Sequence, residues 1–209
     1  MIGELLAPCR VLPVITAGDE AGTVRLCRAL AAAGMRAVEI TLRTPAALDS
    51  LRAVKAELPQ LLVAAGTVTN PRELDAALEA GADILVSPGA TASLLRAAAE
   101  RRAHFVPGVA TASEVMQGLD HGIDTFKLFP AAAAGGIGLL KSLAGPFPGV
   151  QFCPTGGLTA DNFRDYLALP NVVCCGGSWM VAPALVEAGD WDRIAALAAD
   201  AMAEHNHRE

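Results

Sequence analysis

The chain has 209 residues, of which 53% are hydrophobic, so it is long enough to bury a sizeable core. Its net charge of −6 and its lack of any basic run argue against nucleic acid as a partner. Residues 1–10 lack the features of a signal peptide and no later stretch approaches the ~18 apolar residues of a membrane span, so we expect a cytoplasmic protein that does not enter a membrane.

Apolar runs of strand length alternate with alanine-rich stretches of helical period along the whole chain. The expected strands are 11–16, 37–41, 61–65, 84–86, 104–106, 125–129, 151–154 and 172–175. The expected helices are 20–33, 45–58, one starting at 70–71, 92–102, one opening at 111, 138–143, 159–169 and segments up to about 204. Eight such units without a linker predict an α/β protein that forms a single (β/α)8 TIM barrel over residues 1–209. An open doubly wound sheet is the alternative.

Local signals support several helix ends. Asn70 is a suitable N-cap before Pro71, and Thr111 begins a capping-box pattern. Gly34, Gly81 and Gly122 each precede an expected strand by two or three residues, which is typical of left-handed helix caps.

The second expected strand carries polar residues at two-residue spacing. Glu39 and Arg43 share one face with Thr41, and Val38 and Ile40 share the other. A glutamate inside a barrel is costly unless it is paired or has a function. Glu39 could form a structural ion pair, or it could act as a general acid/base while Arg43 binds a substrate carboxylate.

The sixth expected strand contains Lys127, on the same face as Thr125 and Phe129. The two other lysines, Lys55 and Lys141, fall in patterns typical of helix surfaces. Desolvation can lower a lysine pKa from ~10.4 toward ~7–8, and the neutral amine can then form an imine with a carbonyl. The alternative is a lysine that extends from the strand end to solvent.

Further candidates follow other strands. By the parity of Val63 and Ala65, the hydroxyl of Thr67 is expected to point inward, although a simple turn role is equally consistent. Paired glycines follow the seventh and eighth strands and would let backbone amides approach a phosphate. The residues in and beside these pairs are Thr155, Gly156, Gly157, Gly176, Gly177 and Ser178. Two such pairs favour a phosphate-bearing substrate.

The five cysteines show no metal-ligand spacing, and their odd number does not suggest a disulfide framework. Most are expected to be small buried hydrophobes. His205 and His207 lie near the end of the chain, and metal binding there is a minor alternative. A metal-dependent enzyme is therefore not the first choice.

Several motifs together resemble those of the bacterial 2-keto-3-deoxy-6-phosphogluconate (KDPG) aldolases, many of which also cleave 4-hydroxy-2-oxoglutarate (KHG). The matching stretches are 38–44, 65–68, 86–89, 126–131, 153–157 and 176–179, in the family's order. The resemblance implies a class I aldolase of the Entner–Doudoroff pathway on a (β/α)8 barrel, without metal or other cofactor, and commonly a homotrimer.

The resemblance also implies roles for individual residues. Lys127 matches the Schiff-base lysine and Glu39 the acid/base carboxylate, while Arg43 and Thr67 match residues that hold the pyruvate-derived carboxylate. Phe129 lies in the lysine motif and is expected at the substrate. Thr155 matches a position associated with stereochemical choice, and the paired glycines with Ser178 match the phosphate pocket.

The chain departs from the family pattern at Ala132, where a glutamate is common. This departure concerns contacts to the substrate's hydroxyl groups and not the imine chemistry. The sequence leaves two alternatives open. One is cleavage of the galactonate epimer, and the other is an inert barrel that binds a phosphorylated ligand.

Overall fold

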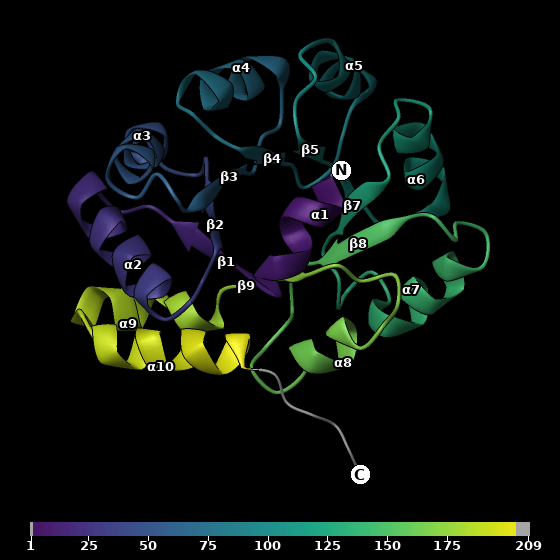
Figure 1. Cartoon of the computed structure of the whole chain (residues 1–209). Coiled ribbons are helices and arrows are strands. Elements are labelled where there is room, and N and C mark those ends of the chain that lie inside the picture. Colours follow the sequence, from purple (N-terminus) through teal and green to yellow (C-terminus); the bar gives the residue numbers. More distant parts are fainter. Residues whose placement is uncertain (1, 204–209) are drawn as a thin grey trace.

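In the computed structural model, which describes residues 2–203, parallel strands curl inside a ring of helices (Figure 1). The strands are β1 Val11–Thr16, β2 Ala37–Thr41, β3 Leu62–Gly66, β4 Ile84–Val86, β5 Phe105–Val106, β6 Gly108–Val109, β7 Thr125–Leu128, β8 Gln151–Pro154 and β9 Cys175–Gly177. The α-helices are α1 Ile2–Leu6, α2 Glu20–Ala32, α3 Ala47–Glu57, α4 Pro71–Glu79, α5 Ala92–Glu100, α6 Ala112–Leu119, α7 Gly136–Ala144, α8 Phe163–Leu167, α9 Pro183–Ala188 and α10 Trp191–Met202. Two short 3-10 helices, η1 Ala7–Cys9 and η2 Trp179–Val181, complete the described elements.

The strands form two parallel sheets in the order β5-β4-β3-β2-β1-β9 and β6-β7-β8. Isolated bridges from Phe152 to Val172 and from Thr155 to Gly176 link β8 to the segment that enters β9. Between β5 and β6 lies Pro107, which has no N–H for a ladder hydrogen bond. The predicted α/β fold with parallel strands is confirmed; the two separate sheets do not establish a closed eight-stranded barrel.

Most predicted elements are confirmed within a few residues, but the strand predicted at 172–175 is wrong. The structure places β9 three residues later, at Cys175–Gly177, where it pairs with β1 in the register Val11 with Cys175. Glycines are depleted in strands, which is why the prediction stopped before Gly176. Here small residues are needed, because a Cβ at Gly176 would fall 2.9 Å from Thr155 Cγ2.

The predicted helix ends are confirmed. The Asn70 side chain accepts hydrogen bonds from the backbone N–H groups of Arg72 and Glu73, and Thr111 forms a capping box with Glu114. Gly34, Gly81 and Gly122 all have positive φ, as expected for left-handed caps. The helix predicted over 159–169 is shorter than expected, because α8 covers only Phe163–Leu167.

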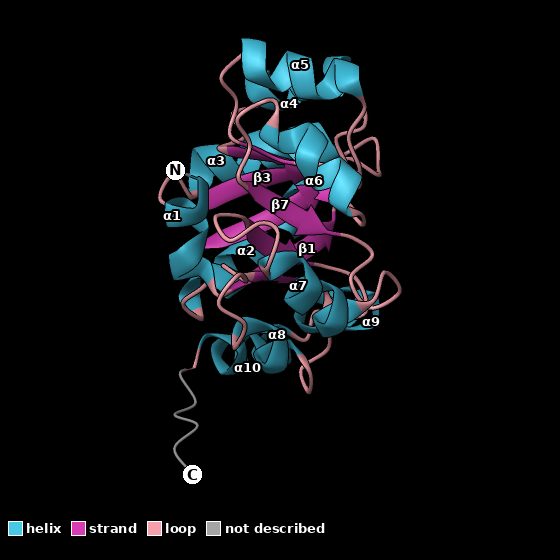
Figure 2. Ribbon diagram, turned by 90° about the vertical axis from the view of Figure 1, so that its right-hand side faces the viewer, coloured by secondary structure: helices cyan, strands magenta, loops and turns pink. Residues whose placement is uncertain are grey.

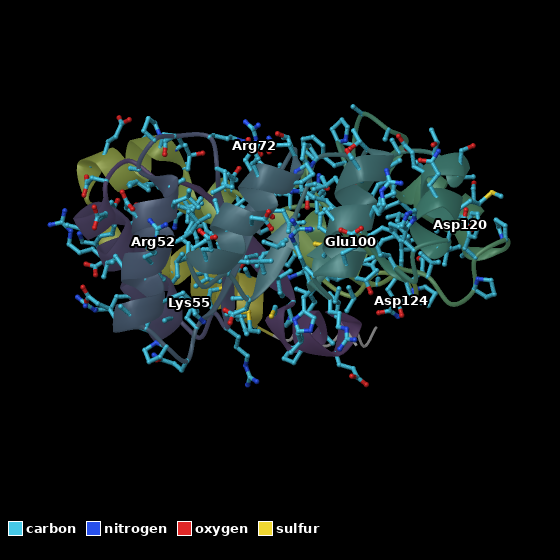
Figure 3. All side chains as sticks on the ribbon, turned by 90° about the horizontal axis from the view of Figure 1, so that it is seen from above. Arg52, Lys55, Arg72, Glu100, Asp120 and Asp124 are labelled. Atoms are coloured by element: carbon cyan, nitrogen blue, oxygen red, sulfur yellow. The ribbon has the colours of Figure 1, made fainter. Side chains whose placement is uncertain are left out.

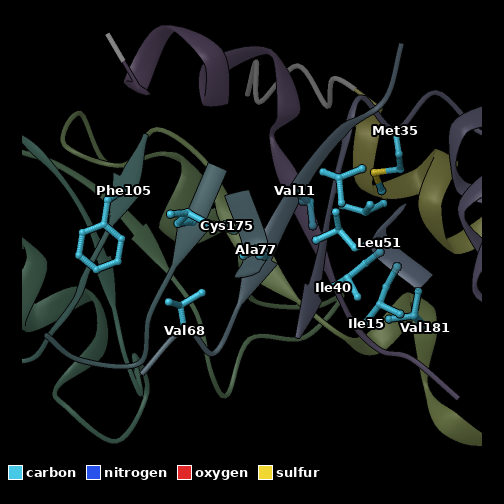
Figure 4. Close-up of a cluster of buried hydrophobic side chains, with 14 of the residues drawn as sticks. Val11, Ile15, Met35, Ile40, Leu51, Val68, Ala77, Phe105, Cys175 and Val181 are labelled. Carbon is cyan, nitrogen blue, oxygen red and sulfur yellow. The ribbon is translucent and has the colours of Figure 1, made fainter. Parts of the chain in front are cut away.

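Two layers of apolar residues hold the fold together. The larger lies between strands and helices and includes Ile15 and Ile40, which pack near Leu51 of α3 (Figure 4). The smaller lies on the inner faces of the strands and includes Leu6 and Cys9 from the N-terminal segment. Figure 2 shows α1 beside the ends at which the strands begin. The N-terminal segment therefore covers one end of the curled sheet, and the opposite end carries the strands' carboxyl termini.

Among the helices of residues 2–203, none combines the length and apolar character needed to cross a membrane.

Candidate active site

Lys127 and Glu39 face each other on the inner side of the strands. Lys127 lies on β7 and Glu39 on β2, and the side chains of Phe126 and Leu128 pack on the opposite, helix-facing side. The Lys127 Nζ atom donates to Glu39 Oε1 at 3.0 Å and lies 3.4 Å from Oε2. Lys127 is 4% and Glu39 1% exposed, so Lys127 does not extend to solvent.

The space for the Glu39 carboxylate comes from Gly66, the last residue of β3. Glu39 pairs with Ala64 in the ladder between β2 and β3, and Gly66 lies two residues further along β3 on the same face, next to the Glu39 side chain. A Cβ at Gly66 would lie 2.6 Å from Glu39 Cγ and 2.8 Å from Cδ, closer than packed atoms tolerate. Sequence analysis missed Gly66. A signal was present in the sequence. A glycine ends one strand on its inward face, and the neighbouring strand carries an inward-facing glutamate.

Phe129 forms part of the same surroundings. Its ring centroid lies 5.3 Å from Lys127 Nζ, within the range of a cation–π contact when the amine is charged. The residue is only partly buried, and it directly follows β7. Phe129 thus forms an apolar wall beside the amine at the carboxyl end of the strand.

Arg43 and Thr67 form a second polar pair at the ends of β2 and β3. Arg43 Nε donates to Thr67 Oγ1 at 3.1 Å, and Arg43 is exposed. The guanidinium therefore keeps N–H groups available for an anion, and the hydroxyl of Thr67 lies next to it.

The parity argument that placed Thr67 was wrong. Val63 and Ala65 pack in the layer between strands and helices, whereas Ala64 faces the inner cluster. Simple alternation would therefore turn Thr67 outward. Thr67 instead has a φ of 61°, a left-handed conformation that is rare for a β-branched residue. This change of backbone direction after Gly66 is what brings its hydroxyl to Arg43.

The residues after β8 and β9 are brought together as neighbours. Thr155 is buried and bridges to Gly176, and its Oγ1 lies 3.4 Å from the backbone carbonyl of Cys153. Gly156 and Gly157 have positive φ values of 97° and 81°, which favour glycine. The two paired-glycine segments thus meet at one edge of the strands.

The loop after β9 begins at Ser178, the last of the residues expected at the phosphate. Ser178 is exposed, and only the three-residue helix η2 follows it. A Cβ at Gly177 would collide with the ring of Trp179, so this glycine also has a packing role. Ala132, exposed in the loop after β7, approaches Gly157 in the same region.

The remaining lysines lie elsewhere. Lys55 forms an ion pair with Asp83 at 2.7 Å on the outer side of α3, where Figure 3 shows it among surface side chains. Lys141 lies in the last turn of α7 and is exposed. The prediction that both belong to helix surfaces is confirmed.

Metal-binding candidates are few. Within residues 2–203, no group of three or more His, Cys, Asp or Glu residues has an arrangement that could hold a metal ion. His205 and His207 lie outside the described residues. The cysteines are buried free thiols, as expected.

Comparison with known proteins shows similarity over almost the whole chain. The family model for KDPG and KHG aldolases matches residues 2–197. A KHG/KDPG aldolase of Escherichia coli K12 is 50% identical over 199 residues, which cover 95% of this chain and 93% of that protein.

Solved structures are similar over almost the whole chain. KDPG aldolase from Legionella pneumophila, with pyruvate captured at low pH as a covalent carbinolamine intermediate, has a TM-score of 0.93 and 43% identity, covering 95% of this chain and 97% of its own. The KDPG aldolase of Zymomonas mobilis ZM4, with 3-phosphoglycerate, has a TM-score of 0.92 and 43% identity, covering 99% and 97%.

Proposed function

The chain belongs to the KDPG and KHG aldolase family, and on this premise we propose that it cleaves 2-keto-3-deoxy-6-phosphogluconate to pyruvate and glyceraldehyde 3-phosphate through a Schiff base on Lys127. We further propose that it acts on 4-hydroxy-2-oxoglutarate. One observation carries this proposal: a buried amine lies 3.0 Å from a buried carboxylate. That pair supplies both a nucleophile and a proton acceptor within reach of each other.

The proposed reaction begins at the substrate's C2 ketone. Glu39 takes the proton that Lys127 must lose, and the neutral amine attacks C2 to give a carbinolamine. Glu39 then returns this proton to the carbinolamine hydroxyl, which leaves as water and gives a protonated imine that acts as an electron sink. Glu39, directly or through a water molecule, then removes the proton from the C4 hydroxyl as the C3–C4 bond breaks. Protonation of the enamine at C3 and hydrolysis of the imine release pyruvate and restore the amine.

The other residues are proposed to bind and orient the substrate. Arg43 and Thr67 hold the carboxylate next to the ketone, which aligns the breaking bond with the imine π system. Their hydrogen bond supports this role, because it places the Arg43 guanidinium and the Thr67 hydroxyl side by side. Phe129 borders the reacting carbons and excludes water from the imine.

The binding of the phosphate and the stereochemical choice are assigned to the residues that follow β8 and β9. Gly156, Gly157, Gly176, Gly177 and Ser178 are proposed to bind the phosphate through backbone N–H groups and the serine hydroxyl. Thr155, buried between these loops, is proposed to contact the C4 region and influence which epimer is cleaved. Their convergence through the bridge from Thr155 to Gly176 supports this assignment.

The decisive experiment traps the imine. Pyruvate and borohydride should add mass to a single peptide, the one that contains Lys127, and Lys127→Ala should give no adduct and no cleavage while remaining folded. An inert phosphate-binding barrel would give no adduct in the unaltered chain either. Substantial turnover by Lys127→Ala would contradict the assignment. Parallel assays with the two phosphorylated epimers would show whether the galactonate form is the better substrate.

Three further proposals concern the architecture, the assembly and the location of the protein. We propose that residues 1–209 form one domain in which the two sheets close into an eight-stranded barrel, with β5 and β6 as the halves of one strand. The bridges between β8 and β9 support this closure. We also propose a cytoplasmic homotrimer, as the family resemblance implies. A crystal structure would test the closure, and light scattering would test the subunit number.

A further inference from the structure

Two cysteines meet on the inner face of the strands, next to the residue pair that we assign to catalysis. The Cys174 thiol donates to Cys153 Sγ, with the two sulfur atoms 3.2 Å apart. Both side chains belong to the inner apolar cluster, and both are free thiols. No step of the proposed reaction uses them.

The backbone explains why these two thiols meet. Between the bridges Phe152–Val172 and Thr155–Gly176, the chain has two residues on the β8 side and three on the other. This extra residue is the hallmark of a bulge, and it turns Cys174 inward beside Cys153. Neighbouring strands lie ~4.8 Å apart, a separation that is compatible with a disulfide between inward-facing cysteines.

The two thiols differ in reactivity. The hydrogen bond from Cys174 lowers the pKa of the Cys153 thiol, and the nearby positive charge of Lys127 acts in the same direction. The pKa of Cys174 is raised by its hydrogen bond to Cys153 and by burial. Cys153 also keeps 3% of its surface exposed, whereas Cys174 has none. Cys153 is therefore the thiol that a small oxidant would meet first and that ionises more readily.

We propose that Cys153 and Cys174 form a site of reversible oxidation, which a peroxide converts to an intramolecular disulfide. The Cys153 thiolate attacks one peroxide oxygen and breaks the O–O bond, and the departing hydroxide leaves as water after it takes up a proton. The resulting sulfenic acid is attacked by Cys174, which forms the S–S bond and releases a second water. The two thiols lose two electrons in total, and the peroxide gains them.

The other thiols are poorly suited to compete. The Cys9 thiol donates to the backbone carbonyl of Leu5, and burial raises its pKa to about 11. Cys27 lies on α2, outside the inner cluster, and burial raises its pKa to about 12. Cys175 packs in the outer layer, where its Sγ lies 3.6 Å from the carbonyl of Phe163. The pairing is thus specific to Cys153 and Cys174.

Oxidation would act on the site through β8. Cys153 pairs with Lys127 in the ladder between β7 and β8, and Thr155 follows two residues later. Drawing the two sulfurs from 3.2 Å to bonding distance moves the backbone that supports the amine. This functional consequence rests on the proposed function. We expect the disulfide to reduce formation of the pyruvate adduct by roughly ten- to a hundredfold, since small misplacements of reacting groups are costly.

The chemical half of the test does not depend on activity. The full chain is treated with hydrogen peroxide, remaining thiols are alkylated under denaturing conditions, and peptides are mapped by mass spectrometry. We expect one linked pair, Cys153 with Cys174, that disappears after dithiothreitol, with Cys27 alkylated throughout. Cys174→Ala should yield no linked peptide. Free Cys153 and Cys174 after treatment, or linkage of Cys153 to another thiol, would overturn the proposal.

The functional half compares pyruvate trapping in reduced, oxidised and re-reduced protein. Trapping should fall on oxidation and return with dithiothreitol. Cys153→Ala, which lacks the thiol that the peroxide attacks, should keep its trapping in peroxide, and Cys27→Ala should behave like the unaltered chain. Circular dichroism checks that each variant is folded, and Cys174→Ser provides a second variant. A linked peptide with unchanged trapping would overturn the coupling to the amine. Absence of trapping in the reduced chain would count against the proposed function alone, because peptide mapping tests the disulfide separately.

Discussion

Gly66 leaves open the space that the side chain of Glu39 occupies. A Cβ at this position would lie 2.6 Å from Glu39 Cγ and 2.8 Å from Cδ, and the carboxylate contacts Lys127 at 3.0 Å. The position of the carboxylate therefore depends on a residue without a side chain on the neighbouring strand.

Gly66→Ala is expected to lower cleavage by roughly a hundredfold, because a displacement of about 1 Å at a reacting group can cost that much. The added methyl would push Glu39 away from Lys127. The variant's kcat should fall more than its KM rises, since Arg43 and Thr67 are not moved directly. Steady-state kinetics check this expectation.

Gly138→Ala is the matched control, because within residues 2–203 no atom other than those of its chain neighbours and its own helix backbone lies within 4 Å of the added Cβ. It lies within α7, where alanine is favoured over glycine by about 0.5–1 kcal/mol. This control should keep full activity and melt at a slightly higher temperature. If Gly66→Ala were as active as Gly138→Ala, the steric argument would fail.

Glu39→Gln tests the proposed proton transfers. Removing a general acid/base costs typically 10²–10⁴-fold, so cleavage should fall by about that factor. The isosteric amide preserves the packing over Gly66, and the Lys127 adduct with pyruvate should still form, although more slowly. Stopped assays with borohydride at increasing times measure the two effects separately.

The exposed glutamate Glu57, which pairs with Arg28 on the surface, provides a control. Glu57→Gln should leave both cleavage and trapping unchanged, because exposed ion pairs contribute little. Equal losses of binding and cleavage in Glu39→Gln would instead indicate that Glu39 only holds the substrate.

The inward direction of the Glu39 and Lys127 side chains could be predicted from sequence, because strand alternation is a local rule and both residues are costly to bury alone. Their partnership could not be derived from periodicity, since it depends on how far the sheet curls. Thr67 shows the limit of alternation: counted from the observed faces of β3, alternation would turn its side chain outward, and its positive φ reverses that direction. Gly176 shows another limit, because its place in β9 depends on contact with Thr155 from a neighbouring segment.

Thr67→Gly should stabilise the fold while weakening substrate binding. A β-branched residue at a φ of 61° stores about 1–3 kcal/mol of strain, part of which glycine would release. Loss of the hydroxyl removes the hydrogen bond to Arg43, so KM should rise about tenfold. Thermal unfolding and steady-state kinetics measure the two effects. Thr67→Ser keeps the hydroxyl and should retain the original KM; an unchanged KM in Thr67→Gly would remove Thr67 from the carboxylate site.

The buried thiol of Cys27 is expected to make the free energy of unfolding depend on pH in the alkaline range. Burial raises its pKa from 9.0 to about 12, so the folded chain keeps a proton that the unfolded chain releases between these values. The stabilisation is therefore complete below pH 9 and is lost as the pH rises toward 12, by on the order of 4 kcal/mol in total. In Cys27→Ala, the free energy of unfolding should decline less steeply over this range, whatever its value at neutral pH. Urea titrations at a series of pH values measure both slopes, and identical slopes in the two proteins would show that Cys27 does not carry the effect.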